Sequence, residues 1–176
     1  MNRVIRKSSA RSSHEVLDLL GALFAIELCY PGTCLWLVSP WISDVGVMDN
    51  TTGNFPALAP FGRQPARITE VLVTMAAEGT QIVVATTNDP HNDAFKRRLT
   101  VLARDLNVTA NITIKTDPTG RLHTKSLTSD TYALAGSMNI TYNGIHIREE
   151  QVELRTEADY VAQARMDAYD RFGGRL

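Results

Sequence analysis

Short apolar runs that stand between turn residues are the feature that most constrains how this chain can fold. Residues 34–38 read CLWLV and residues 81–85 read QIVVA. Runs of this kind are typical of buried strands. Stretches with helical spacing separate them from the other candidate strands, so the sequence predicts an α/β fold with one mixed central sheet and helices on both of its faces.

The remaining elements follow from apolar periodicity and from capping and turn residues. Apolar residues recur at three- and four-residue spacing after Ser12 and Ser13, either of which can cap a first helix. We expect helices over residues 14–28, 66–78, 92–106 and 158–172. We expect strands over residues 34–38, 81–85, 110–115, 122–127, 132–135 and 151–155. Between them, residues 45–65 are rich in Gly and Pro and predict a long loop, of a length that is usually functional or mobile.

Size and charge restrict the classes of protein to consider. The chain has 176 residues and a net charge of −1 from 18 basic and 19 acidic side chains. This fits a single domain, which we place at residues 13–176 after a loose basic arm over residues 1–12. The near-neutral charge means that any site for a polyanion must be a local patch. No apolar run approaches the length of a membrane span, and Cys29 and Cys34 are expected to be free thiols, so we expect a cytoplasmic protein.

One stretch, residues 121–153, combines side chains that suit a phosphate. His123 and Lys125 would share one face of a strand, and Ser137 and Asn139 repeat that spacing after Gly136. An ammonium and hydrogen-bond donors can hold phosphate oxygens, and a histidine can attack phosphorus. Each of these residues alone is more often structural, but together they favour a catalytic site.

This pattern resembles the signature of the phospholipase D superfamily. The residues that carry the resemblance are His123-x-Lys125-x-x-x-x-Asp130, then Gly136-Ser137-x-Asn139, then Glu150. The spacing from Asp130 to Gly136 is one residue shorter than is common in that family. The resemblance covers about thirty residues, and the upstream alternation of strands and helices is compatible with the family's single α/β domain.

The resemblance implies a two-step displacement at a phosphodiester. One histidine forms a phosphohistidine, and a second histidine protonates the leaving oxygen and then activates water. Lys125, Ser137 and Asn139 would contact phosphate oxygens, Glu150 would orient the ring of His123, and Asp130 and Gly136 would be structural. Because the chain contains one such motif, the second histidine is expected from a second copy in a homodimer. No metal ion and no cofactor is expected.

The substrate remains open between several classes. The segment Ser39–Asp44 adds a resemblance to phospholipase D-like proteins of bacterial gene clusters that insert 7-deazapurine bases into DNA and restrict unmodified DNA. This favours a DNA nuclease, with other proteins of such a defence cluster as partners. Candidate contacts to the DNA backbone are Lys96, Arg97, Arg98 and Arg121, although a solvated helix face explains these charges equally well.

Two alternatives stay beside the nuclease. The first is a weakly active module that binds DNA or a partner protein. The second is a phospholipase, for which the sequence offers no membrane-facing surface apart from Phe55, Leu58 and Phe61 in the expected long loop. Aromatic residues make up only 7% of the chain, so a stacking platform for single strands is not evident.

Overall fold

The computed structural model describes residues 2–7 and 14–176, and its centre is a seven-stranded sheet. The strands lie in the order β1-β9-β8-β7-β2-β5-β6. Their bounds are β1 Asn2–Lys7, β2 Cys34–Val38, β5 Gln81–Thr87, β6 Ile112–Asp117, β7 Ser126–Thr128, β8 Ala133–Gly136 and β9 Glu150–Arg155.

Strand direction changes in the middle of this sheet. β2, β5 and β6 run parallel to one another, whereas β7 pairs antiparallel with β2, and β8, β9 and β1 continue antiparallel. The prediction of a mixed central sheet in an α/β fold is therefore confirmed. The parallel half brings the carboxyl ends of β2 and β5 to one edge, which is where α/β sheets commonly place ligands.

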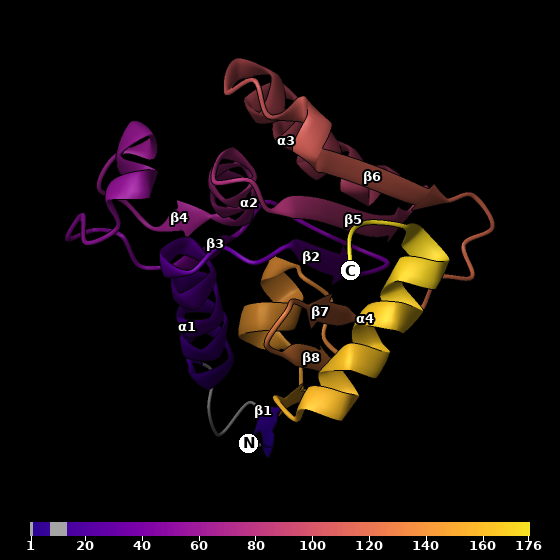
Figure 1. Cartoon of the computed structure of the whole chain (residues 1–176). Coiled ribbons are helices and arrows are strands. Elements are labelled where there is room, and N and C mark those ends of the chain that lie inside the picture. The colour runs from indigo at the N-terminus through magenta and orange to yellow at the C-terminus, as the bar shows by residue number, and fades with distance from the viewer. Residues whose placement is uncertain (1, 8–13) are drawn as a thin grey trace.

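Helices cover both faces of the sheet, as Figure 1 shows. Three helices pack on one face, namely α1 (Glu15–Cys29), α2 (Ile68–Ala77) and α3 (Asp93–Asp105), and α4 (Ala158–Phe172) packs on the other. β2 serves both layers because its side chains alternate: Leu35 joins the core under the three helices, and Trp36 joins the cluster under α4. None of the helices in the described part of the chain is long and apolar enough to cross a membrane.

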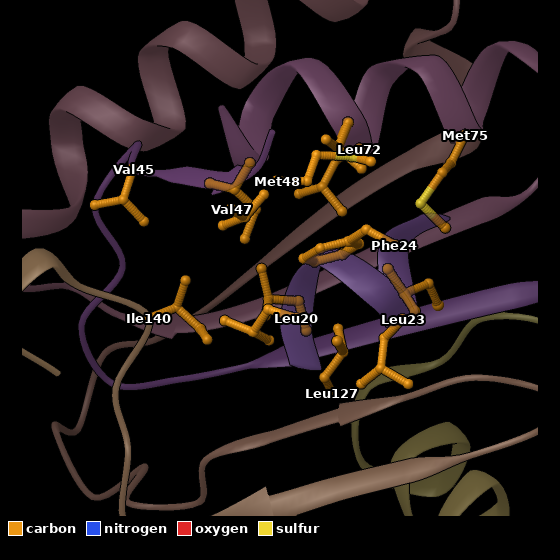
Figure 2. Close-up of a cluster of buried hydrophobic side chains, with 14 of the residues drawn as sticks. Leu20, Leu23, Phe24, Val45, Val47, Met48, Leu72, Met75, Leu127 and Ile140 are labelled. Carbon is orange, nitrogen blue, oxygen red and sulfur yellow. The ribbon is translucent and has the colours of Figure 1, made fainter. Parts of the chain in front are cut away.

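The main core lies between α1, α2 and the sheet. Figure 2 shows Leu20 and Phe24 of α1 close to Leu72 and Met75 of α2, and all four are buried. The stripe that the sequence predicts for the first helix is thus used to bury apolar surface, which is the main source of helix stability in proteins.

The segment that the sequence predicts as a long loop carries regular structure. Gly46–Met48 forms β3, which pairs with β4 (Ala66–Arg67), and Pro56–Phe61 forms a 3₁₀ helix. Leu58 is fully buried, and Phe55 and Phe61 pack against the core. The prediction of one long loop over residues 45–65 is therefore wrong, and these apolar side chains pack in or against the core.

Two further expectations need correction. Residues 2–7, which were expected in a loose arm, form β1, because Ile5 and Lys7 are buried on one face of a strand that pairs with β9. The rest of the expected arm, residues 8–12, and the expected helix caps Ser12 and Ser13 lie outside the described residues. The strand expected over residues 122–127 begins only at Ser126. His123 and Lys125 therefore lie in an extended segment before β7 rather than within a strand.

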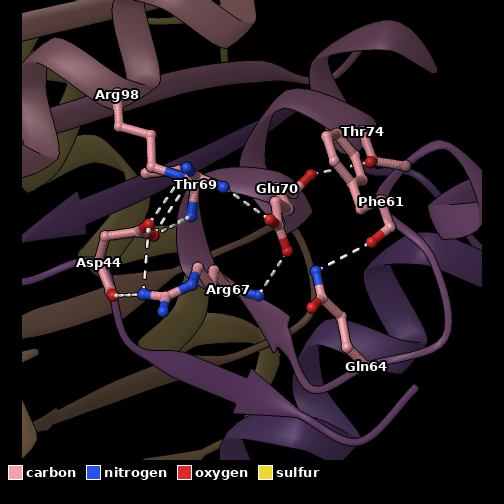
Figure 3. Close-up of polar contacts among 8 residues, drawn as sticks. All are labelled: Asp44, Phe61, Gln64, Arg67, Thr69, Glu70, Thr74 and Arg98. Carbon is pink, nitrogen blue, oxygen red and sulfur yellow. Dashed lines mark hydrogen bonds and ion pairs between the residues drawn. The ribbon is translucent and has the colours of Figure 1, made fainter. Parts of the chain in front are cut away.

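An ion network ties α3 to α2 and to the loop after β2 (Figure 3). The Arg98 guanidinium lies 2.8 Å from a carboxylate oxygen of Asp44 and 2.8 Å from one of Glu70. Glu70 is almost completely buried, and its other oxygen accepts a hydrogen bond from the backbone N–H of Arg67. A buried carboxylate needs such a partner because losing it leaves an uncompensated charge.

We predict that Arg98→Ala lowers the free energy of unfolding by about 1–3 kcal/mol, because it strands the buried Glu70 carboxylate. Arg97→Ala is the matched control, since Arg97 is exposed on the same helix and should change stability by less than about 0.5 kcal/mol. Urea denaturation of both variants measures the difference. Equal losses in the two variants would contradict this role for Arg98.

Candidate active site

His123 and Lys125 lie side by side in the segment that leads into β7. The Lys125 ammonium is 3.3 Å from Nδ1 of His123 and donates a hydrogen bond to the His123 carbonyl at 2.7 Å. An ammonium can only donate, so Nδ1 accepts in this arrangement and the ring proton of a neutral His123 lies on Nε2. The ring itself is exposed, which leaves Nε2 accessible to a ligand.

Lys125 is a buried cation whose main neighbour of opposite charge is Glu150. Burial lowers the pKa of the Lys125 ammonium, and the negative charge of Glu150 partly offsets this effect by raising the pKa. A desolvated ammonium binds an anion more strongly than one in water, because the interior screens charge less. Lys125 is therefore suited to hold a phosphate oxygen.

The end of β8 joins this pair to β9. A side chain at Gly136 would overlap the backbone carbonyl of Gln151, so only glycine fits where the two strands approach so closely. The next residue, Ser137, donates from its hydroxyl to a carboxylate oxygen of Glu150 and accepts from the backbone N–H of Gln151. The Gly136 N–H bonds the Lys125 carbonyl, which links the two halves of the motif.

Asn139 lies in the turn that follows and is also buried. Its side-chain oxygen accepts a hydrogen bond from the Ser39 hydroxyl at 3.2 Å, and Ser39 also accepts from the backbone N–H of Ile140. A side chain at Gly144 would overlap the Asn139 carbonyl, so this turn is closely packed. Asn139 is thus fixed from the end of β2, a contact that the motif spacing does not reveal.

The expected pairing of Glu150 with the His123 ring is not found among the hydrogen bonds of the described residues. Lys125 occupies the position beside Nδ1, and Glu150 instead contacts Ser137 and faces the Lys125 charge. Glu150 is therefore held by Ser137, and its charge acts on the Lys125 ammonium. Glu149, its neighbour, is exposed.

Lys7 is a site residue that the sequence analysis missed. It is only 4% exposed, stands opposite Glu150 in the β1–β9 register, and donates to the Gly144 carbonyl at 2.9 Å. Burial lowers the pKa of its ammonium, and Glu150 partly raises it again. The sequence carries no local signal for this burial, because Arg3, Ile5 and Lys7 share one face of the strand and two of these three are charged.

Asp130 lies away from these residues, in the turn between β7 and β8. Its carboxylate accepts a hydrogen bond from the Thr33 backbone N–H at 2.6 Å and pairs with Arg165 at 3.0 Å. Because the turn is at the opposite end of β7 from Lys125, the role of Asp130 in the structure is to hold the hairpin against the start of β2.

Two of the four predicted DNA contacts are already paired with acidic side chains of the protein, and two are not. Lys96 pairs with Asp93 at 2.9 Å, and Arg98 is held in the ion network. Arg97 and Arg121 are exposed, and their side chains have no polar partner within residues 2–7 and 14–176. Arg121 lies two residues before His123, and the exposed Arg148, two residues before Glu150, likewise has no polar side-chain partner within the described residues.

Two cavities flank the site and meet at Trp41. The first, of about 490 Å³, is lined by Asn139 and Glu150, and the second, of about 530 Å³, by His123. Trp41 and Asp89 line both. The site therefore offers a nucleophilic ring, a desolvated ammonium and a carboxamide beside two spaces of ligand size. Within the described residues, no group of three or more His, Cys, Asp or Glu side chains is arranged to hold a metal ion.

No family model matches the sequence, and no curated protein matches it. Among solved structures, NucT from Helicobacter pylori superposes with a TM-score of 0.59 at 12% identity, over 99% of both chains. Nuc from Salmonella typhimurium, a phospholipase D family member, gives a TM-score of 0.59 at 14% identity, over 99% of this chain and 96% of that one.

A larger protein contains the same fold as one part. Polyphosphate kinase from Porphyromonas gingivalis superposes with a TM-score of 0.60 at 14% identity over 96% of this chain, which spans only 25% of the kinase. The two nearly full-length superpositions, together with the mixed seven-stranded sheet, identify the architecture: the chain has the fold of the phospholipase D superfamily.

Proposed function

We propose that this protein is a metal-independent phosphodiesterase, a DNA nuclease of a bacterial modification and restriction system. The observation that carries the proposal is the gathering of Lys125, Ser137, Asn139 and Glu150 beside an exposed His123. Oriented donors and a buried cation supply the charge stabilisation on which phosphoryl transfer mainly depends. Two structural neighbours of nearly the same length, Nuc and NucT, support this class of activity.

The reaction would proceed through a covalent intermediate. Nε2 of His123 attacks phosphorus, the bond from phosphorus to the leaving oxygen breaks, and a second histidine donates its proton to that oxygen. Water then attacks the phosphohistidine and releases the other product. The proton donor has to be an imidazolium protonated on both ring nitrogens, because a neutral imidazole is too weak an acid, so Lys125 would have to leave Nδ1 in that copy. In the attacking copy, movement of Lys125 onto a phosphate oxygen would free Nδ1 to carry the ring proton.

The second histidine would come from a second copy of the chain. A two-fold axis places identical patches against each other, so two copies of His123 can face one phosphate. None of the other histidines, His14, His91 and His146, is followed two residues later by a lysine. The exposure of His123 supports this arrangement, because a partner can reach it. We also propose that the protein acts in the cytoplasm with other proteins of a defence cluster.

The two alternatives, a binding module and a phospholipase, each require features that can be compared with the structure. A binding module without hydrolysis would not need Lys125 desolvated beside the imidazole. A phospholipase needs an apolar entrance, but Phe55, Leu58 and Phe61 are packed on the core instead. These observations favour a hydrolase that acts on a polar diester.

We predict hydrolysis of DNA in EDTA, and a loss of at least about a thousandfold in His123→Ala, because that variant removes the attacking group. Plasmid, single-stranded DNA and RNA should be assayed together to identify the substrate. His14→Ala is the control, since His14 is also exposed and lies at the start of α1. Activity that disappears in EDTA and returns with Mg²⁺ would contradict the mechanism.

We predict that one active site contains two chains. Wild-type protein refolded with an excess of His123→Ala protein should lose activity per wild-type chain in proportion to its dilution, because most wild-type chains then share a site with an inactive one. Sedimentation should show a dimer. Constant activity per wild-type chain would mean that each chain works alone.

We predict that Glu150→Gln lowers activity by about 10- to 1000-fold, whereas Glu149→Gln leaves it unchanged. Glutamine still accepts from Ser137 but removes the charge that raises the pKa of Lys125, so the pKa of that ammonium should fall further. Rates measured from pH 6 to pH 9 should therefore drop at a lower pH in Glu150→Gln. If Glu149→Gln were the damaging change, the assigned register would be wrong.

A further inference from the structure

Two large aromatic side chains border the cavity that contains Asn139 and Glu150. Trp41 is 42% exposed and Tyr142 is 59% exposed, and both line this cavity of about 490 Å³. A single exposed ring is common on a protein surface, but two exposed rings that border one cavity offer a ligand a flat and largely apolar surface. The low aromatic content of the chain hides this feature, because composition does not show where the rings gather.

Both rings are held in place rather than free. The Trp41 indole N–H donates to one oxygen of Asp89 at 3.1 Å, and the other oxygen of Asp89 accepts the His91 backbone N–H at 2.8 Å. The Tyr142 ring packs against the His146 ring, with centroids 4.6 Å apart and planes inclined by 35°. A ring whose orientation is fixed loses little conformational freedom when a flat ligand stacks on it.

The position of Trp41 relates the rings to the reaction. Trp41 lines both cavities, one of which contains His123 and the other Asn139 and Glu150. A phosphodiester has one substituent on each side of its phosphorus. A phosphate held between His123 and Asn139 would therefore direct one substituent into each cavity, on either side of Trp41.

The linings favour nucleosides over acyl chains as these substituents. Thr87, Asn88, Asp117 and Thr119 line the cavity with His123, and Ser43 and Asn143 line the other. Of these, Asn88 and Asn143 are exposed and make no side-chain hydrogen bond within the described residues, so their amides can bond the edges of bases and sugars, which an acyl chain cannot do. A third cavity beside Tyr142, lined by Leu17, Val45 and Met48, is more apolar and would suit a lipid better.

We propose that Trp41 and Tyr142 form a stacking subsite for an unpaired nucleobase next to the scissile phosphate. The substrate is therefore single-stranded nucleic acid, because a base must leave the duplex before its face can meet a side chain. This inference rests on the proposed function for the position of the phosphate, but the stacking itself requires no hydrolysis.

Binding can be tested in the His123→Ala background, where turnover does not interfere. Ten-residue oligothymidylate should quench the emission of Trp41, because stacking on a base quenches indole fluorescence, and Trp41→Phe should abolish this signal while retaining most affinity. Trp41→Ala and Tyr142→Ala should each weaken binding about 10-fold, as is usual for base stacking. Tyr30→Ala is the matched control, since Tyr30 is 80% exposed and lines neither cavity.

An abasic oligonucleotide of the same length and charge separates stacking from folding effects. The abasic strand should bind the parent protein about 10-fold more weakly than oligothymidylate does. The Trp41→Ala protein should bind the abasic strand and oligothymidylate with equal affinity, because it lacks the stacking ring. If Trp41→Ala lowers the affinity for both strands by the same factor, or for neither strand, the subsite is refuted. Quenching by phosphatidylglycerol vesicles but not by oligothymidylate would refute it in favour of a lipid. If quenching occurs but the wild-type protein hydrolyses no strand, the proposed hydrolysis fails and the subsite stands.

Discussion

The site depends on the buried carboxamide of Asn92, which fixes the loop between the two halves of the molecule. Its nitrogen donates to the carbonyls of Pro40 and Thr87 at 2.9 and 3.0 Å, and its oxygen accepts the backbone N–H of Ile42 at 2.8 Å. Asn92 therefore holds the residues on both sides of Trp41. A buried amide that loses its partners costs free energy, so these three bonds together favour the one loop conformation that satisfies all of them.

The same loop is held from its other side by the turn that contains Asn139. Ser39 bonds the Asn139 side chain, the Ser43 N–H bonds the Ile140 carbonyl, and Ile42 forms a bridge with Ile140. Loops usually vary more than the elements that they connect, and functional residues on them need a rigid support. Here the parallel strands supply one support, the antiparallel strands supply the other, and the site lies where the two meet.

The sequence reveals the fold more fully than the site, for physical reasons that particular residues illustrate. The runs over β2 and β5, the apolar stripe of α1 and the bounds of α4 follow from local periodicity, which burial enforces. The burial of Lys7 does not follow from local periodicity, because it results from the pairing of β1 with β9 and from the bond to the Gly144 carbonyl, 137 residues away. Asn92 stands at the start of the expected helix over residues 92–106, where an asparagine side chain often caps a helix, but its side chain instead bonds the loop after β2. The spacing of His123 and Lys125 identified their neighbours correctly, but it could not show that Lys125 rather than Glu150 lies beside the ring.

The place of β1 in the sheet has a consequence for how the protein is made. A ribosome synthesises Asn2–Lys7 well before their partner β9, which lies more than a hundred residues later in the chain. Until then the strand has no ladder, and Lys7 has neither the Gly144 carbonyl nor Glu150 to compensate its charge. Pairings between the ends of a chain are slow to form because the intervening loop must close first. The site therefore gains its second buried cation only after β9 has been synthesised, so that a nascent chain without β9 lacks part of the charge that surrounds Glu150.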